Sequence, residues 1–247
     1  MIGKRGWTIG RCPTKSEIIK SGALEIDAAD LARGGFRART AEATRKALRL
    51  KVNALYYPLN GAGAYATIPL TSGSGRYDVR LYRQVTGKRY TAIGRATIRA
   101  KLEREDAAFL RPNLYVDYDP DGGWPALTAR WITDGEAPEA AFETIRAFIR
   151  RQFAYDYVRA ATVADGTLPD IERCWESRMG ICQDLAALAA CMLRSCGIPA
   201  RLAIGRADGR LHAWTVVTLG ERAIRYDPTA ELGAIKNPTK YSAERWY

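Results

Sequence analysis

The segment GICQDLAALAACMLRSCGIPARLAIG, residues 180–205, constrains the fold more than any other part of the chain. A run of good helix formers begins at Cys182, and Gly197 provides a stop. The apolar residues of this run share one helical face: Leu185, Leu188, Ala189 and Met192. A helix with such a face packs against a core, so we predict a buried helix that carries a thiol at its first position.

The helix start gives the Cys182 sulfur special chemistry. The first backbone N–H groups of a helix have no partner inside the helix, and with the helix dipole they favour a thiolate, the form that attacks carbonyl groups. The same N–H groups can stabilise an oxyanion that forms next to the sulfur. The Cys182 N–H is the first candidate for this role, and Tyr155 and Trp175 are candidate second donors. Gln183 and Asp184 are expected only to cap or charge the first turn.

The residues after this helix bring a histidine and an acid into register. Strands are expected at about 200–204, 212–219 and 223–226. A two-residue turn at Gly220-Glu221 would place His212 opposite Thr229, with Asp227 diagonal to it on the same face. A carboxylate bonded to one imidazole nitrogen fixes the tautomer and leaves the other nitrogen to take the thiol proton. We therefore predict Cys182 as nucleophile, His212 as base and Asp227 as orienting acid.

At these residues the chain resembles the transglutaminase-like superfamily, which is related in architecture to papain-type cysteine proteases. The matching elements stand in family order: Gly180-Ile181-Cys182 at the helix start, Arg194 to Arg201 around Gly197-Ile198-Pro199, His212-Ala213-Trp214 on a strand, and Asp227-Pro228-Thr229. The resemblance covers about residues 138–247. It implies helices packed on an antiparallel sheet, a Cys-His-Asp triad and no cofactor. The chain shows no calcium loop, so calcium dependence is not implied.

The expected activity is acyl transfer by a thiol enzyme. Cys182 would attack an amide or peptide carbonyl, and the resulting thioester would pass its acyl group to water or to an amine. Water as acceptor means a peptidase or amidase, whereas an amine means a transglutaminase. Hydrolysis is favoured because water is always available. The implied partner is a peptide or protein, cell-wall peptides included. The alternative is a non-catalytic peptide- or glycan-binding module that retains the fold.

The first half of the chain indicates an antiparallel β module. Turn residues at Asn60-Gly61, 72–75 and 86–88 separate runs rich in Val, Ile, Tyr and Thr between about 48 and 102. Tyr77 to Arg83 alternates apolar and polar residues, as a strand with one buried face does. We predict a small sandwich of immunoglobulin-like type, of the sort that precedes such domains in some bacterial members. Residues 1 to about 45 are expected to be loose or edge structure, with a short strand at 23–26.

Proline and glycine between residues 111 and 137 predict a connector that contains the domain boundary. The predicted α+β protein therefore has a β-sandwich at 1–118 and a papain-like domain at 119–247. Pro138 opens a helix whose apolar residues share one face: Phe142, Ile145, Ile149 and Phe153. A second helix is expected from Pro169 to Met179, ended by Gly180 in the left-handed conformation.

The cysteines do not indicate a disulfide scaffold or a metal site. Cys12, Cys174, Cys182, Cys191 and Cys196 are an odd number without C-x-x-C spacing, and His212 is the only histidine of the chain. We therefore expect no metal. On an apolar helix a cysteine is usually a small core residue, which is the role expected for Cys191 and Cys196.

Bulk properties exclude few other functions. The chain has 247 residues, 47% of them hydrophobic, and no apolar run near the roughly 20 residues of a membrane span. Its formal net charge of +11 comes from scattered basic residues without a nucleic-acid motif, so we do not expect nucleic-acid binding. The charged N-terminus lacks the apolar stretch of a signal peptide, so the protein either stays inside the cell or is a trimmed form.

Overall fold

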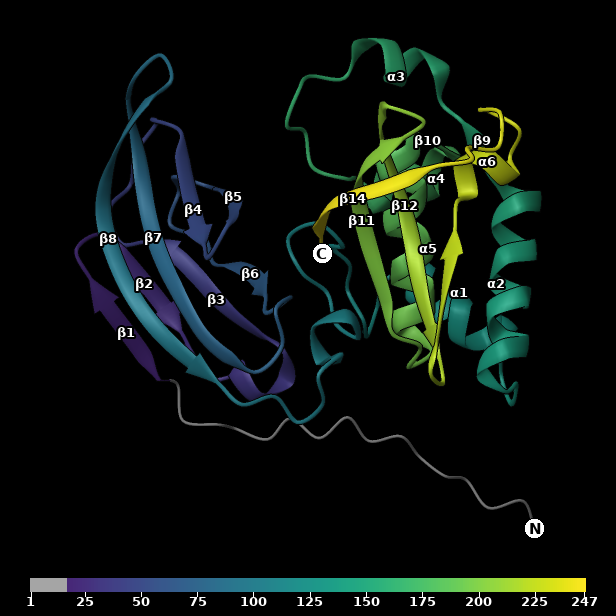
Figure 1. Ribbon diagram of the computed structural model, residues 1–247, viewed down its shortest axis with the longest axis horizontal. Helices are drawn as coiled ribbons and strands as arrows, with labels where there is room; N and C mark the ends of the chain where they lie inside the picture. Colours follow the sequence, from purple (N-terminus) through teal and green to yellow (C-terminus); the bar gives the residue numbers. More distant parts are fainter. Residues whose placement is uncertain (1–16) are drawn as a thin grey trace.

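Two groups of strands with helices beside the second make up the protein. The computed structural model describes residues 17–247, so Cys12 and the charged start of the chain lie outside the described residues. Figure 1 shows the N-terminal strands on one side and the helices with the C-terminal strands on the other. The predicted α+β class is therefore confirmed, with antiparallel sheets preceding a mixed C-terminal part. None of the helices in the described residues is long and apolar enough to cross a membrane.

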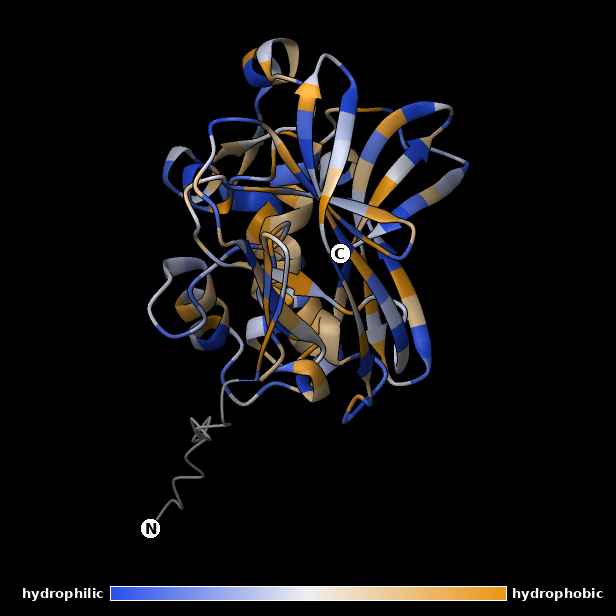
Figure 2. Ribbon diagram, turned by 90° about the vertical axis from the view of Figure 1, so that its left-hand side faces the viewer, coloured by the Kyte–Doolittle hydropathy of each residue, from blue (hydrophilic) through white to orange (hydrophobic). Residues whose placement is uncertain are grey.

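The N-terminal part contains two four-stranded antiparallel sheets, with the orders β1-β2-β3-β6 and β5-β4-β7-β8. Alternation of hydrophilic and hydrophobic residues along these strands is visible in Figure 2. The predicted antiparallel β module is present, whereas its immunoglobulin-like type stays a prediction. The strands are β1 (Ile18–Ser21), β2 (Leu24–Asp27), β3 (Gly35–Thr40), β4 (Leu48–Val52), β5 (Leu55–Leu59), β6 (Ala66–Pro69), β7 (Gly75–Thr86) and β8 (Arg89–Ala100).

The expectation of loose or edge structure is wrong for most of residues 17–45. Strand β1 is an edge, but β2 and β3 lie inside their sheet and fully bury Leu24, Ile26 and Phe36. The strands are only four and six residues long, and both faces of β2 are buried, so the period-2 signal is weak.

The predicted connector contains a helix, which corrects the expectation for residues 111–137. Helix α1 (Trp124–Ile132) has Pro125 in its first turn, where the missing N–H costs nothing. Ala126 and Ala129 are fully buried, and α1 packs on the later helix α5 (Cys182–Ser195). The boundary near residue 118 stays a prediction.

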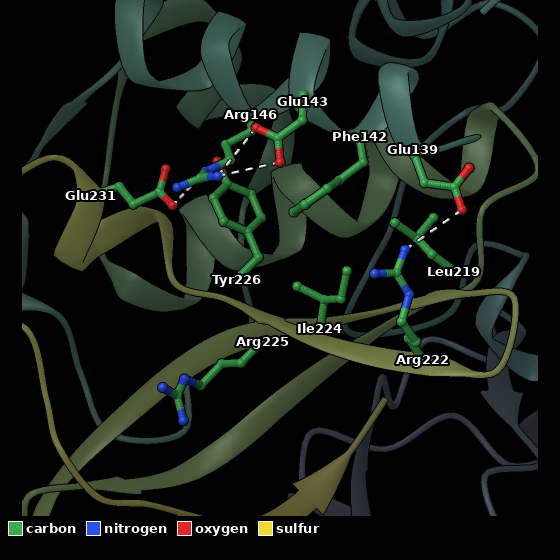
Figure 3. Close-up of a pocket in the computed structure, with 10 residues that line it drawn as sticks. All are labelled: Glu139, Phe142, Glu143, Arg146, Leu219, Arg222, Ile224, Arg225, Tyr226 and Glu231. Atoms are coloured by element: carbon green, nitrogen blue, oxygen red, sulfur yellow. Dashed lines mark hydrogen bonds and ion pairs between the residues drawn. The ribbon is translucent and has the colours of Figure 1, made fainter. Parts of the chain in front are cut away.

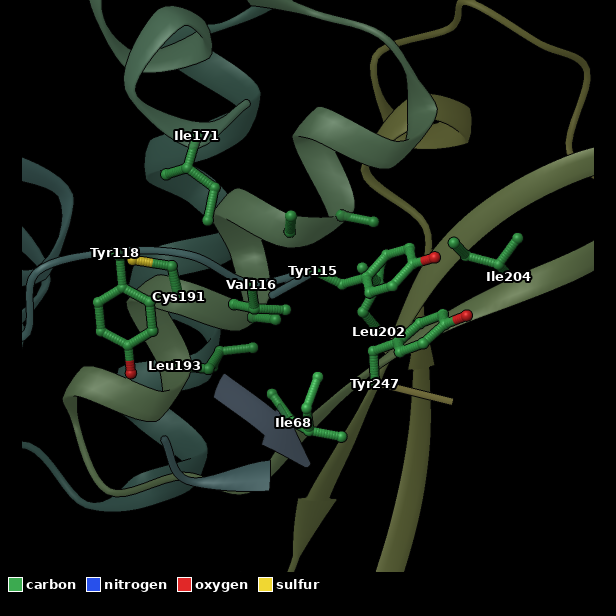
Figure 4. Packing of buried hydrophobic residues seen from close by; sticks show 14 of the residues in the cluster. Ile68, Tyr115, Val116, Tyr118, Ile171, Cys191, Leu193, Leu202, Ile204 and Tyr247 are labelled. Carbon is green, nitrogen blue, oxygen red and sulfur yellow. The ribbon is translucent and has the colours of Figure 1, made fainter. Parts of the chain in front are cut away.

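A cluster of tyrosines joins the two parts of the chain. Tyr57 of β5 lies edge-on to Tyr115 and to Tyr247, with ring centroids 6.2 and 5.8 Å away. Tyr115 and Tyr247 stack with centroids 3.6 Å apart. Figure 4 shows this stack beside Leu202 and above Ile68 of β6. The N-terminal sheets and the C-terminal part therefore share one buried junction.

The C-terminal part packs helices against an antiparallel sheet of order β13-β12-β11-β14. Helix α5 lies against β11 and β12. Helix α2 begins at Pro138, as predicted, and buries Phe142, Ile145 and Ile149. The elements are α2 (Pro138–Gln152), β9 (Ala154–Tyr155), α3 (Tyr157–Thr162), α4 (Ile171–Ser177), β10 (Met179–Gly180), β11 (Ala200–Ala207), β12 (Arg210–Leu219), β13 (Arg222–Tyr226), α6 (Pro228–Glu231) and β14 (Tyr241–Trp246).

The second predicted helix exists but ends differently. Helix α4 ends at Ser177, and Arg178 takes the left-handed conformation with φ 56° that was expected of Gly180. Gly180 instead pairs with Tyr155 in a short parallel bridge. A Cβ on Gly180 would lie 2.7 Å from Cys174 Sγ, so glycine is needed there for close approach and not for its φ.

Candidate active site

Cys182 is the first residue of α5, with its side chain partly exposed at the end of a buried helix. The helix start is held by Asp184, which is fully buried. One oxygen of Asp184 accepts from the Ile181 N–H at 3.2 Å and from Arg159 Nε at 3.0 Å, and the other accepts from the Asp170 N–H at 3.0 Å. The expected capping role of Asp184 is thus observed, and the nucleophile candidate stands on a rigid turn.

His212 and Asp227 meet, but the predicted pairing of His212 with Thr229 is wrong, because the ladder stops at Thr215–Tyr226 and Thr229 lies in α6. Leu219 pairs with Arg222, so Gly220-Glu221 is a two-residue turn, with Gly220 at φ 59°. Strand β13 ends at Tyr226, and Asp227 therefore acts as N-cap of α6, not as a strand residue. Its Oδ2 lies 2.8 Å from His212 Nε2.

Asp227 is held from two sides. Its Oδ1 accepts from the N–H groups of Thr229 and Ala230 at 3.1 and 3.2 Å. Burial opposes its charge, but the hydrogen bonds and charge of its partners outweigh burial and hold the pKa of Asp227 below its usual range. The carboxylate is therefore ionised and fixed in orientation.

The His212 imidazole lies between the Asp227 carboxylate and the Cys182 thiol. Burial lowers the pKa of His212, but hydrogen bonding to Asp227 and to Cys182, with their charges, outweighs burial and raises that pKa to about 9. Because Nε2 faces Asp227, Nδ1 is the ring nitrogen left for the thiol. His212 therefore interacts with both Asp227 and Cys182, and the structure brings the three predicted site residues together.

Tyr241 belongs to this cluster and was missed by sequence reasoning. Its hydroxyl donates to Asp227 Oδ2 at 2.7 Å, the oxygen that also faces His212. Its ring lies 4.9 Å from the Trp214 ring, and the Arg225 guanidinium carbon is 4.0 Å from its centroid. The alternation of apolar and polar residues from Tyr241 to Glu244 indicates a strand, but no feature near it in sequence connects Tyr241 with Asp227.

The two candidate oxyanion donors lie in different places. Tyr155 pairs with Gly180, two residues before Cys182, and burial and then the Cys182 charge raise the pKa of Tyr155 to about 12. Trp175 packs against Phe148 and Phe153 with centroids 6.0 and 5.8 Å away, in an aromatic cluster. Tyr155 is therefore the better candidate.

The remaining predicted residues have structural roles. Gln183 donates to the Thr167 carbonyl at 2.9 Å. Cys191 is fully buried, and Cys196 Sγ lies 3.3 Å from Thr133 Oγ1. Within residues 17–247, no three His, Cys, Asp or Glu side chains gather into a group that could hold a metal ion.

A cavity of about 310 Å³ lies close to the site but does not include it. Figure 3 shows it between α2 and β13, with the Arg146–Glu231 ion pair of 2.6 Å at one end and Arg222 at the other. Cys182 and His212 are not among its lining residues.

Comparisons with known proteins match a family model in the C-terminal part and solved structures over most of the chain. Residues 125–228 match the family model of the transglutaminase-like superfamily. Among solved structures, a putative cysteine protease from Cytophaga hutchinsonii is similar at 17% identity and a TM-score of 0.44, covering 86% of this chain and 78% of that one. A putative protease from Parabacteroides distasonis ATCC 8503 is similar at 15% identity and a TM-score of 0.37, covering 73% of this chain and 37% of that one. No curated protein matches.

Proposed function

Since the chain carries a domain of the transglutaminase-like superfamily at residues 125–228, we propose that it is a thiol enzyme whose nucleophile is Cys182. The observation that carries this proposal is the 2.8 Å contact of Asp227 with the imidazole that also contacts the Cys182 thiol. In the proposed triad His212 is the base and Asp227 is the orienting acid. The three side chains come from a helix start, a strand and a helix cap.

The proposed first step is acylation of the sulfur. His212 Nδ1 takes the thiol proton, and the thiolate forms a bond to the carbonyl carbon of an amide or peptide. The Cys182 N–H at the helix start, and the Tyr155 hydroxyl as second donor, stabilise the oxyanion. The imidazolium returns its proton to the leaving amine as the C–N bond breaks, which leaves a thioester on Cys182.

The proposed second step transfers the acyl group to water. His212 removes a proton from the attacking water, the C–S bond breaks as the imidazolium returns that proton to the sulfur, and the carboxylic acid leaves. The raised pKa of His212 supports its first role, because an imidazole that binds its proton tightly can take it from the thiol. A partly exposed sulfur leaves water free to reach the thioester, which supports a peptidase or amidase over a transglutaminase. The proposed substrate is a peptide or protein.

Trapping of an acyl adduct tests this proposal. The purified protein would be incubated with a peptide and cell-wall-fragment library, and mass spectrometry would locate thioesters. We expect an adduct on Cys182 and none in the Cys182→Ala variant.

Cys196→Ala is the matched control, because Cys196 is a second partly exposed thiol without an imidazole neighbour. It should retain turnover and rapid alkylation of Cys182 by iodoacetamide. Turnover retained in Cys182→Ala would refute Cys182 as the nucleophile. A Cys182 thiol that reacts no faster than free cysteine would instead favour a non-catalytic peptide- or glycan-binding module.

A further inference from the structure

One oxygen of Asp227 makes two hydrogen bonds, of which the proposed triad needs only the one to His212. Oδ2 faces His212 Nε2 at 2.8 Å and accepts from the Tyr241 hydroxyl at 2.7 Å. The phenol comes from β14, at the opposite edge of the sheet from β13, which leads into Asp227. Its ring therefore extends over the sheet face that carries His212 and Trp214.

The Tyr241 ring helps to keep this pair dry. The side chains of His212 and Asp227 are only 7% and 6% exposed. Tyr241 lies against Trp214 on one side, and Arg225 lies over the ring on the other. Water therefore has little room to replace a donor lost from Asp227, so the phenol and the carboxylate depend on each other.

We propose that Tyr241 is a positioning residue of the site, whose hydroxyl holds the Asp227 carboxylate against His212 and takes a share of the negative charge that faces the imidazole. This inference rests on the proposed function for its catalytic meaning. The hydroxyl acts as donor throughout, because burial and the nearby carboxylate raise the pKa of Tyr241 well above its usual value. Removal of the donor leaves more charge on Oδ2, so the imidazolium becomes harder to deprotonate.

The other charged groups around the site do not replace the phenol. Cys182 at the start of α5 is the second partner of His212. Arg225 of β13 and Asp208, in the turn between β11 and β12, act on Tyr241 with opposite signs. Asp208 is itself bonded to the N–H groups of Thr239 and Lys240 at about 3 Å, and these bonds hold its pKa below the usual range. Among these groups, the phenol is the only second donor to Asp227 Oδ2.

The single histidine makes the test direct. His212 is the only histidine of the chain, so a tag-free, histidine-labelled protein gives one imidazole signal in NMR. Titration from about pH 5 to about pH 11 measures its pKa, and the nitrogen shifts report its tautomer. In Tyr241→Phe we expect the pKa to rise by about half a unit or more, with the Nε2–H tautomer retained.

Tyr247→Phe is the matched control. Within residues 17–247 its buried hydroxyl, just beyond β14, has no hydrogen-bond partner, so its loss should leave the imidazole pKa unchanged. Difluorotyrosine at position 241 has the opposite effect to Tyr241→Phe, because a more acidic phenol is a stronger donor. The pKa of the His212 imidazole should then fall. This second protein decides the question if Tyr241→Phe does not fold.

An imidazole pKa that is unchanged or lower in Tyr241→Phe, or unchanged with difluorotyrosine, would overturn the role of Tyr241. The titration needs no substrate, which separates the two proposals. A shifted imidazole in a protein without turnover would support Tyr241 and count against the enzyme proposal. An unshifted imidazole pKa in a protein with turnover would overturn the role of Tyr241 and support the enzyme proposal.

Discussion

Replacing Asp184 with Asn is expected to destabilise the protein by about 3 kcal/mol. The carboxylate is fully buried, and one of its oxygens accepts from both Arg159 and the Ile181 N–H, while the other accepts from the Asp170 N–H. An asparagine oxygen can replace only one of these two oxygens. Its NH₂ group must then face a donor, and the guanidinium, only 17% exposed, loses its counter-charge.

A loss of about 3 kcal/mol in a chain of this size corresponds to a Tm about 6–12 °C lower. Thermal and urea denaturation followed by circular dichroism would measure it. Because Asp184 holds the first turn of α5, alkylation of Cys182 by iodoacetamide should also slow. Glu172→Gln, an exposed acid in the first turn of α4, is the control and should change stability by less than about 0.5 kcal/mol. A change below about 1 kcal/mol in Asp184→Asn would refute this reading of the helix start.

Other predictions concern the same part of the molecule. Asp227→Asn should lower kcat/KM on the order of 10²- to 10⁴-fold, because an amide no longer selects the Nε2–H tautomer; near wild-type kinetics would contradict its role. The unfolding free energy should fall by on the order of 2 kcal/mol as pH rises from 6.5 to about 9, since folded His212 binds its proton more tightly than the unfolded chain does. A His212→Asn variant should lack that slope in urea titrations. Gly180→Ala should destabilise by about 1–3 kcal/mol through the contact of its Cβ with Cys174 Sγ, and Cys174→Ala should restore part of the loss.

The nearness of His212 and Asp227 could be predicted from the sequence, whereas the role of Asp227 as a helix cap could not. A two-residue turn at Gly220-Glu221 leaves one register for the two strands, and that register brings the acid near the imidazole. The helix start at Cys182 follows in the same way from composition and a glycine stop. The approach of that helix to the strand is not local, and it was expected only through the family resemblance.

Elements whose partners are distant in sequence could not be predicted. Strand β14 pairs with β11, whose residues lie 34 to 43 positions earlier, beyond β12, β13 and α6, so nothing near Tyr241 indicates that it reaches Asp227. Helix α1 was hidden because Pro125 and the preceding glycines are typical of a loop, although proline is well tolerated in a first helical turn. The sequence predicts a helix end at Gly180 because glycine favours the left-handed conformation. It does not reveal that the Cys174 sulfur lies beside this residue.

Strand β14 connects the proposed active site with the N-terminal sheets. Its first residue, Tyr241, bonds to the proposed catalytic acid, and the residue just beyond its end, Tyr247, is stacked on Tyr115 and Tyr57 at the junction with the N-terminal sheets. A strand is stiff along its length, and about 20 Å separates its two ends. A C-terminal part that is expressed alone would lack Tyr57, one of the two tyrosines against which Tyr247 packs. We therefore expect the N-terminal sheets to help hold Tyr241, and through it Asp227 and His212, in position.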